Sequence, residues 1–129
     1  MTSRITSVPI DCTDPEALAA FWAAVLGWRI RTTQWQPTPH GLDGAVLTPG
    51  EDGWFELDFR WVPEPKRTKN RIHFDVHAAD GDQDAELTRL LALGATPVDV
   101  GQGDRSWHVL ADPEGNEVCL CRSPDQPVR

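Results

Sequence analysis

A pattern that occurs twice along the chain is the feature that most limits how it can fold. The first copy reads ITSVPIDCTDPEALAAFWAAVLGW and the second reads RIHFDVHAADGDQDAELTRLLALGAT. Each copy has an alternating strand, an aspartate, and an amphipathic helix that ends in Leu-Gly. Asp14 and Asp80 lie 66 positions apart, and the Leu-Gly pairs beginning at Leu26 and Leu93 lie 67 apart. Two copies are too few for a solenoid, so the repeat predicts a duplicated module.

The two predicted helices have recognisable ends. Asp14 is suited to cap the first helix, and Gly27 can adopt the left-handed conformation that ends it. Either Asp80 or Asp82 is suited to cap the second helix, which we expect to stop at Gly94. The positions spaced for one buried stripe are Leu18, Phe21, Trp22 and Val25 in the first helix, and Leu87, Leu90 and Leu91 in the second.

Strand-like segments follow each helix, separated by turns such as TPGEDG and DPEGN. These segments cover residues 28–36, 44–48 and 54–62 in the first copy, and 96–100, 107–111 and 117–122 in the second. The element order is therefore βαβββ, a basic linker, and βαβββ again, which predicts an α+β fold. Pro9 cannot donate a backbone hydrogen bond, so it indicates an edge position or a bulge in the first strand.

We expect one domain over residues 1–129. Module 1 would run over about 3–62, the linker over 63–69, and module 2 over about 70–123.

Four of the predicted strands alternate polar and apolar side chains, so each should bury one face against a helix. The polar sets are Ser7, Pro9 and Asp11; Trp54, Glu56, Asp58 and Arg60; Arg71, His73, Asp75 and His77; and Glu117, Cys119 and Cys121. If the sheet curves, these sets converge on a cavity. Single polar strand residues are more often solvated than ligating, so the alternation leaves a wet outer face as the alternative.

Composition excludes several classes of function. A net charge of −8 argues against nucleic acid as a partner, because phosphate binding needs a basic surface. The one basic cluster, KRTKNR, lies in the linker and is expected to be a solvated loop. No apolar run approaches the roughly 18 residues of a membrane span. The sequence MTSRITSVPIDC has no apolar signal core, so we expect a cytoplasmic protein.

The cysteines predict neither a disulfide framework nor a structural zinc site. Cys12, Cys119 and Cys121 are three in number, which leaves any framework incomplete. Cys119 and Cys121 are two residues apart in one predicted strand, where side chains on one face do not normally pair. No CxxC spacing occurs in the chain.

The chain resembles the vicinal oxygen chelate superfamily, the glyoxalase, bleomycin resistance and dioxygenase group, and within it the small glyoxalase-like domain proteins. The resemblance is carried by TDPEALAAFWAAVLGW, NRIHFDVHAAD and LADPEGNEVCLC, and it covers nearly the whole chain. It implies two βαβββ modules whose eight strands form a curled mixed sheet around a cavity, with the helices on the outer face. It also implies a homodimer.

Metal-binding members of this superfamily take one ligand from each of four strands. In this sequence the resemblance places those positions at Ser7, Glu56, His73 and Cys119, with Glu117 two residues earlier on the same face. Only Glu56 and His73 match the usual ligand types, and Ser7 is a poor ligand for a divalent cation. The resemblance therefore implies a degenerate site, in which the candidate ligands for Zn, Ni or Fe are Glu56, His73 and Cys119, with Glu117 as the alternative to Cys119.

Three functions remain open from the sequence. The favoured one is binding of a small organic molecule, with an antibiotic-sequestering protein as one form of it. The predicted pocket residues are Trp54, Asp58, Arg71, Asp75, Trp107 and Glu117, with Trp35 as a further aromatic wall. The second is a glyoxalase-type lyase or isomerase that uses Glu56 and His73 as catalytic residues, either with a divalent metal or without one. In the metal-free form the two residues would act as an acid–base pair, because histidine titrates near neutrality. The third is a stable dimeric domain without chemistry of its own.

Overall fold

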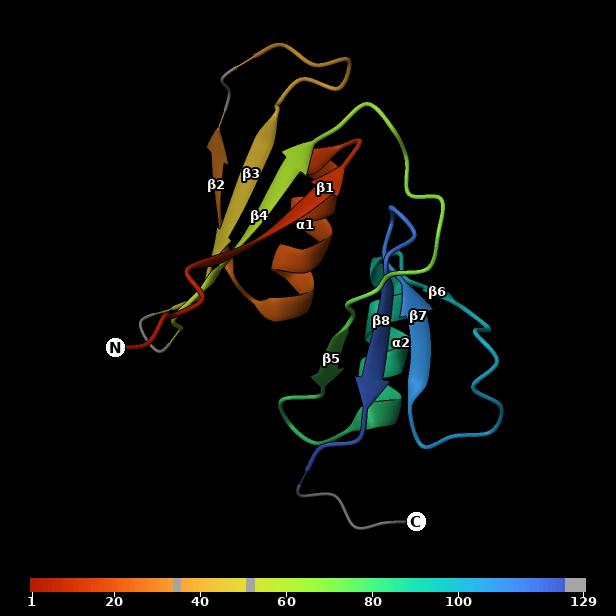
Figure 1. Cartoon of the computed structure of the whole chain (residues 1–129). Coiled ribbons are helices and arrows are strands. Elements are labelled where there is room, and N and C mark those ends of the chain that lie inside the picture. Colours follow the sequence, from red (N-terminus) through yellow and green to blue (C-terminus); the bar gives the residue numbers. More distant parts are fainter. Residues whose placement is uncertain (34–35, 51–52, 125–129) are drawn as a thin grey trace. The chain divides into compact units, whose positions relative to one another are not determined.

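The computed structural model describes residues 1–33, 36–50 and 53–124 of the chain. Trp35, a candidate pocket wall, lies outside these residues. The chain forms two compact units, Met1–Lys66 and Arg67–Arg129, and in each of them a helix lies against one face of a sheet (Figure 1). No helix in the described ranges is long and apolar enough to cross a lipid bilayer.

The first unit follows the predicted βαβββ order. Its elements are β1 (Ser7–Cys12), α1 (Pro15–Leu26), β2 (Arg29–Thr33), β3 (Gly44–Thr48) and β4 (Glu56–Trp61). The strands form one sheet in the order β1-β4-β3-β2, in which β1 and β4 are parallel and the other pairs are antiparallel. β1 is an edge strand of this sheet, which confirms the position that Pro9 predicted.

The second unit repeats this topology. Its elements are β5 (Phe74–His77), α2 (Gln83–Leu93), β6 (Thr96–Pro97), β7 (His108–Ala111) and β8 (Glu117–Cys121). The strand order is β5-β8-β7-β6, again with the first and last strands parallel. The α+β class and the two βαβββ modules are confirmed. The strands form two four-stranded mixed sheets, neither of them closed.

Helix α1 has the ends that the sequence predicted. The Asp14 carboxylate accepts a hydrogen bond from the Ala17 backbone N–H at 3.2 Å. Gly27 ends the helix with a φ of 70°, a left-handed conformation that glycine adopts without steric strain. Phe21 and Trp22 are buried and contact each other edge to face, with ring centroids 5.4 Å apart.

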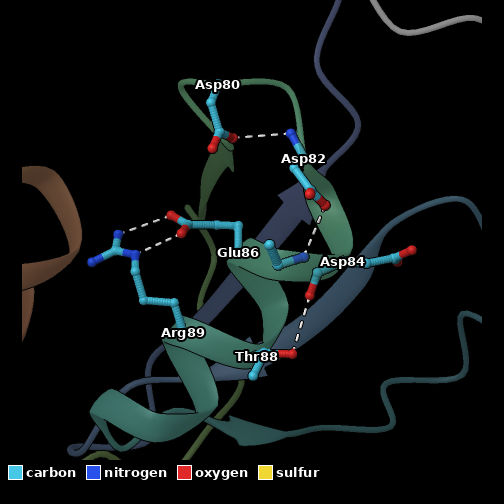
Figure 2. A network of polar contacts seen from close by, with 7 residues as sticks. Asp80, Asp82, Asp84, Glu86, Thr88 and Arg89 are labelled. Carbon is cyan, nitrogen blue, oxygen red and sulfur yellow. Dashed lines mark hydrogen bonds and ion pairs between the residues drawn. The ribbon is translucent and has the colours of Figure 1, made fainter.

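Helix α2 is capped by Asp82, one of the two predicted candidates. The Asp82 carboxylate accepts from the Ala85 N–H at 3.0 Å, and the Asp80 carboxylate accepts from the Asp82 N–H at 3.0 Å (Figure 2). Asp80 therefore holds the residue that caps the helix. The buried stripe of α2 is narrower than predicted: Leu90 is buried, whereas Leu91 is exposed.

The apolar sets of two of the four alternating strands are buried in the core, as predicted, whereas Val8 and Ile10 of β1 and Phe74 and Val76 of β5 are half-buried. Leu57 and Phe59 of β4 are buried in the first unit, and Val118 and Leu120 of β8 are buried in the second. Burying one such side chain stabilises a fold by roughly 1.5–3 kcal/mol relative to leaving it exposed. Each sheet thus has an apolar face committed to packing, and its polar residues lie on the opposite face.

The alternating segment at the start of module 2, whose polar set is Arg71, His73, Asp75 and His77, forms a strand only from Phe74. Ile72, which we expected on the apolar face of that strand, is 81% exposed and lies at a bend. The predicted strand over 96–100 is likewise reduced to Thr96–Pro97. Both differences lie beside the polar face of the second sheet.

Candidate functional site

The polar face of the second sheet brings together residues from three strands. Asp75 of β5 lies opposite Cys119 of β8 in the parallel register, and Val109 of β7 lies opposite the same cysteine in the antiparallel register. His77 is paired with Cys121 in the same way. Side chains in register share a face, so this face carries both thiols and an aspartate side by side.

A pocket of about 430 Å³ lies over this face, and we call it the second-unit pocket. Its volume falls within the roughly 300–1,000 Å³ of small-molecule sites. Its lining consists of an apolar group, two thiols, and a polar group that includes both signs of charge. The lining residues are Val100, Trp107 and Val109; Cys119 and Cys121; and Lys69, His73, Asp75, Gln102 and Glu117.

One wall of the second-unit pocket is the segment between β6 and β7, which side chains hold in place. The Gln102 side chain donates to the Val98 carbonyl at 3.1 Å and accepts from the Val100 N–H at 2.8 Å. Arg105 donates to the Gln102 carbonyl at 2.8 Å, and its guanidinium lies 5.7 Å from the centre of the Trp107 ring. These contacts fix Val100 and Trp107 in the lining without a regular strand.

Three potential metal ligands gather at the floor of the pocket: His73, Asp75 and Cys119, which we call the His-Asp-Cys cluster. One ligand atom from each lies within 4.8 Å of the other two. His73 Nε2 is 3.3 Å from Asp75 Oδ1. Their side chains are 42% and 64% exposed, respectively, whereas Cys119 is half-buried.

The surroundings of both thiols of the pocket raise their pKa values and so favour the protonated form. Burial raises the pKa of Cys119, and the charge of Asp75 and a hydrogen bond to its carboxylate raise this pKa further, while Lys69 opposes the shift. Burial and Asp75 likewise raise the pKa of Cys121. Protonated thiols are poor nucleophiles. A catalytic cysteine is activated by a lowered thiol pKa, so the raised pKa values of Cys119 and Cys121 do not indicate this role.

Two other predicted pocket residues lie near the start of β5. Glu117 lines the pocket, and its carboxylate accepts a hydrogen bond from the Asn70 N–H at 2.9 Å. Glu117 therefore also holds the segment that leads into β5. Arg71 is exposed at a bend in that segment, and it is not among the described residues that line the pocket.

Two predicted residues of the first unit, Trp54 and Glu56, line a different feature, whereas Asp58 is not among the residues that line either this feature or the second-unit pocket. A groove of about 400 Å³, the first-unit groove, is lined by Thr6, Thr48, Pro49, Gly53, Trp54, Phe55 and Glu56. Trp54 is 69% exposed and contacts Phe55 edge to face. Glu56 Oε2 is 3.6 Å from Arg31 Nη2, and Asp58 Oδ1 is 2.8 Å from Arg60 Nε. Both acidic residues are thus paired with arginines of their own sheet.

The structure therefore brings five predicted site residues around the second-unit pocket. These are His73, Asp75, Trp107, Glu117 and Cys119. The predicted pairing of Glu56 with His73 joins residues of different units and stays a prediction. Sequence reasoning missed Val100 and Gln102, because the segment between β6 and β7 has no periodic pattern. Cys121 lies on the predicted polar face of β8, and two-residue alternation alone places it with Cys119.

Two βαβββ modules, each with a helix on one face of its mixed sheet, define the vicinal oxygen chelate class of fold. Within that class, residues 7–121 match the glyoxalase-like domain family, so the chain belongs to that family. No curated protein matches the sequence.

Solved structures with the same fold cover nearly the whole chain. One is the fosfomycin resistance protein FosX from Mesorhizobium loti, with 14% identity, a TM-score of 0.66, and coverage of 97% of this chain and 95% of that one. Another is TnmS3, an antibiotic binding protein from Streptomyces sp. CB03234, with 22% identity, a TM-score of 0.58, and coverage of 95% and 98%. A third is a glyoxalase/bleomycin resistance protein/dioxygenase family enzyme from Burkholderia phytofirmans PsJN, with 22% identity, a TM-score of 0.61, and coverage of 92% and 97%. At these identities the likeness shows a shared fold.

Proposed function

We propose that the protein binds a small organic molecule in the second-unit pocket. The observation that carries this proposal is the pocket's lining: Trp107, Val100 and Val109 provide an apolar wall beside the polar floor of Asp75 and Cys119. A mainly apolar cavity with a few fixed polar groups is the usual form of a small-molecule site. The raised pKa values of both thiols favour the protonated form, so the floor is suited to contact a ligand rather than to attack it.

The lining favours a ligand with a flat apolar body. Trp107 offers an indole surface for stacking, and Arg105 already lies over its ring, so a ligand reaches the indole from the other face or the edge. Asp75 and Glu117 line the pocket together with the single ammonium group of Lys69. A cationic substituent on the ligand would therefore meet two carboxylates.

An antibiotic is one ligand class that fits this description. TnmS3 is named as an antibiotic binding protein and FosX as a fosfomycin resistance protein, and both share the fold of this chain. For this protein we propose sequestration, because binding alone needs no complete metal site. The homodimer implied by the family resemblance stays part of this proposal, and light scattering of the purified protein tests it.

Calorimetric titration tests the binding proposal with two planar probes of opposite charge, ethidium and anilinonaphthalene sulfonate. We expect saturable binding of ethidium at one molecule per chain, and weaker binding of the sulfonate. The chelator EDTA is present throughout, so that bound metal plays no part. Failure of both probes, and of a wider panel of planar antibiotics, would contradict the proposal.

A glyoxalase-type lyase or isomerase is the second candidate function. The observation in its favour is the position of His73 beside Asp75 and Cys119, where an added divalent metal such as Zn, Ni or Fe finds potential ligands. The test is turnover of the methylglyoxal–glutathione hemithioacetal after each metal is added. Activity lost in both Glu56→Gln and His73→Ala would support this candidate, and inactivity with every metal would exclude this reaction.

A further inference from the structure

We propose that the second unit by itself carries a zinc site, in which the His73 imidazole, the Asp75 carboxylate and the Cys119 thiolate are the ligands. This site goes beyond small-molecule binding and does not depend on it. It also differs from the set that the family resemblance implies, because Asp75 takes part and no ligand comes from the first unit.

The local backbone places the three groups together. Asp75 and Cys119 are paired in the parallel register of β5 and β8, so their side chains share one face of the sheet. His73 directly precedes β5 and is two residues from Asp75, which is the spacing that returns a side chain to the same side of an extended chain. The observed contact of 3.3 Å between His73 Nε2 and Asp75 Oδ1 agrees with this placement.

The distances are close to those of a tetrahedral zinc site. Zinc bonds of about 2.0–2.3 Å at tetrahedral angles separate neighbouring ligand atoms by roughly 3.3–3.7 Å. His73 Nε2 and Asp75 Oδ1 already lie 3.3 Å apart, and the ligand atoms of all three residues lie within 4.8 Å of one another. Closing the cluster requires shifts of about 1 Å, which the exposed His73 and Asp75 side chains can make by rotating.

The ligand set points to zinc among the common divalent metals. A thiolate favours soft metals, imidazole suits zinc and its neighbours, and Mg²⁺ and Ca²⁺ prefer oxygen ligands alone. Three protein ligands leave a fourth position open, as in zinc sites that bind an exchangeable group. That position would face the second-unit pocket, since His73, Asp75 and Cys119 all line it.

Glu56 is not needed for this site. In the first unit, Glu56 Oε2 lies 3.6 Å from Arg31 Nη2, so its carboxylate already has a cationic partner there. This difference gives the experiment its sharpest control. A site made by the second unit alone binds zinc without Glu56, whereas the set of Glu56, His73 and Cys119 does not.

Metal titration of the chelator-stripped full-length protein tests the proposal. We expect one Zn²⁺ per chain by calorimetry, and a near-ultraviolet thiolate-to-cobalt charge-transfer band when Co²⁺ is added instead. Cys119→Ser should abolish the band. His73→Ala and Asp75→Asn should each weaken zinc binding by about tenfold or more, since even outer-shell changes cost that much.

Two variants serve as matched controls. Cys121→Ser changes the other thiol of the pocket, and Glu56→Gln changes the carboxylate of the first unit; both should retain the band and the stoichiometry. Loss of zinc binding in either control variant would overturn the single-unit site. A charge-transfer band that survives in Cys119→Ser would also overturn it. So would the absence of stoichiometric zinc binding in the unmodified protein. Thermal melts check the fold of each variant, and the exposed His73 and Asp75 variants keep the test decisive if Cys119→Ser does not fold. Ethidium binding by the unmodified protein in EDTA involves no metal, so the absence of a zinc site would leave the small-molecule proposal standing.

Discussion

Replacing Trp107 with alanine is the change that probes the proposed pocket most directly. Trp107 lines the second-unit pocket and is 38% exposed, so a ligand can still cover that part of its surface. A whole tryptophan has a surface of about 250 Å², so the exposed 38% of Trp107 amounts to about 95 Å². Covering all of it contributes about 2.4 kcal/mol at about 25 cal/mol per Å², and covering half contributes about 1.2 kcal/mol. Ethidium binding should therefore weaken by about 7-fold to 50-fold in the variant.

Isothermal titration calorimetry measures this effect without relying on the fluorescence of the residue that is removed. Trp54→Ala is the matched control, because Trp54 is also an exposed tryptophan but lines the first-unit groove. We expect it to leave ethidium binding within about twofold of the unmodified protein, as a contact outside the pocket should. If Trp107→Ala binds ethidium normally while Trp54→Ala does not, the reasoning that places the site in the second unit is refuted.

Three further predictions concern stability and thiol chemistry. Leu120→Ala should lower the free energy of unfolding by about 2–5 kcal/mol in urea titrations, because the side chain is fully buried under α2; a loss below about 1 kcal/mol would contradict that packing. Asp82→Ala should cost about 1 kcal/mol by the same measurement, since it removes the α2 cap, and an unchanged midpoint would argue against the cap. Asp75→Asn should speed iodoacetamide alkylation of Cys119 and Cys121 at a fixed, mildly alkaline pH in EDTA. Asp75 is one of the causes that raise both thiol pKa values, so removing its charge lowers them and increases the thiolate fraction; slower alkylation would contradict this sign.

The fold could be predicted from the sequence because its signals are local. Asp14 and Gly27 mark the ends of α1 by cap chemistry that needs no distant partner, and the same signals recur around α2. The ends of strands, unlike those of helices, depend on where the neighbouring strand of the sheet begins and ends. β8 begins only at Glu117, so Ile72 finds no paired backbone beside it, although the alternation of the sequence continues through that residue.

Only part of the candidate site could be predicted from local signals in the sequence. Two-residue alternation places Asp75 and Cys119 on the polar faces of their strands, and the register of β5 and β8 then brings them together. The wall that holds Val100 and Trp107 depends on side-chain hydrogen bonds from Gln102, which leave no periodic trace in the sequence. For that reason the floor of the pocket was foreseen and much of one wall was not.

The central claim is that the second unit of this glyoxalase-like protein binds a small organic molecule in its own pocket. Nitrogen-15 correlation spectra recorded during an ethidium titration test this claim directly. We predict saturable shifts of the Trp107 indole N–H and of the backbone amides of Val100, Val109 and Cys119, with Trp54 and Glu56 unchanged. Saturable shifts confined to Trp54 and Glu56, with the Trp107 indole signal unmoved, would contradict it.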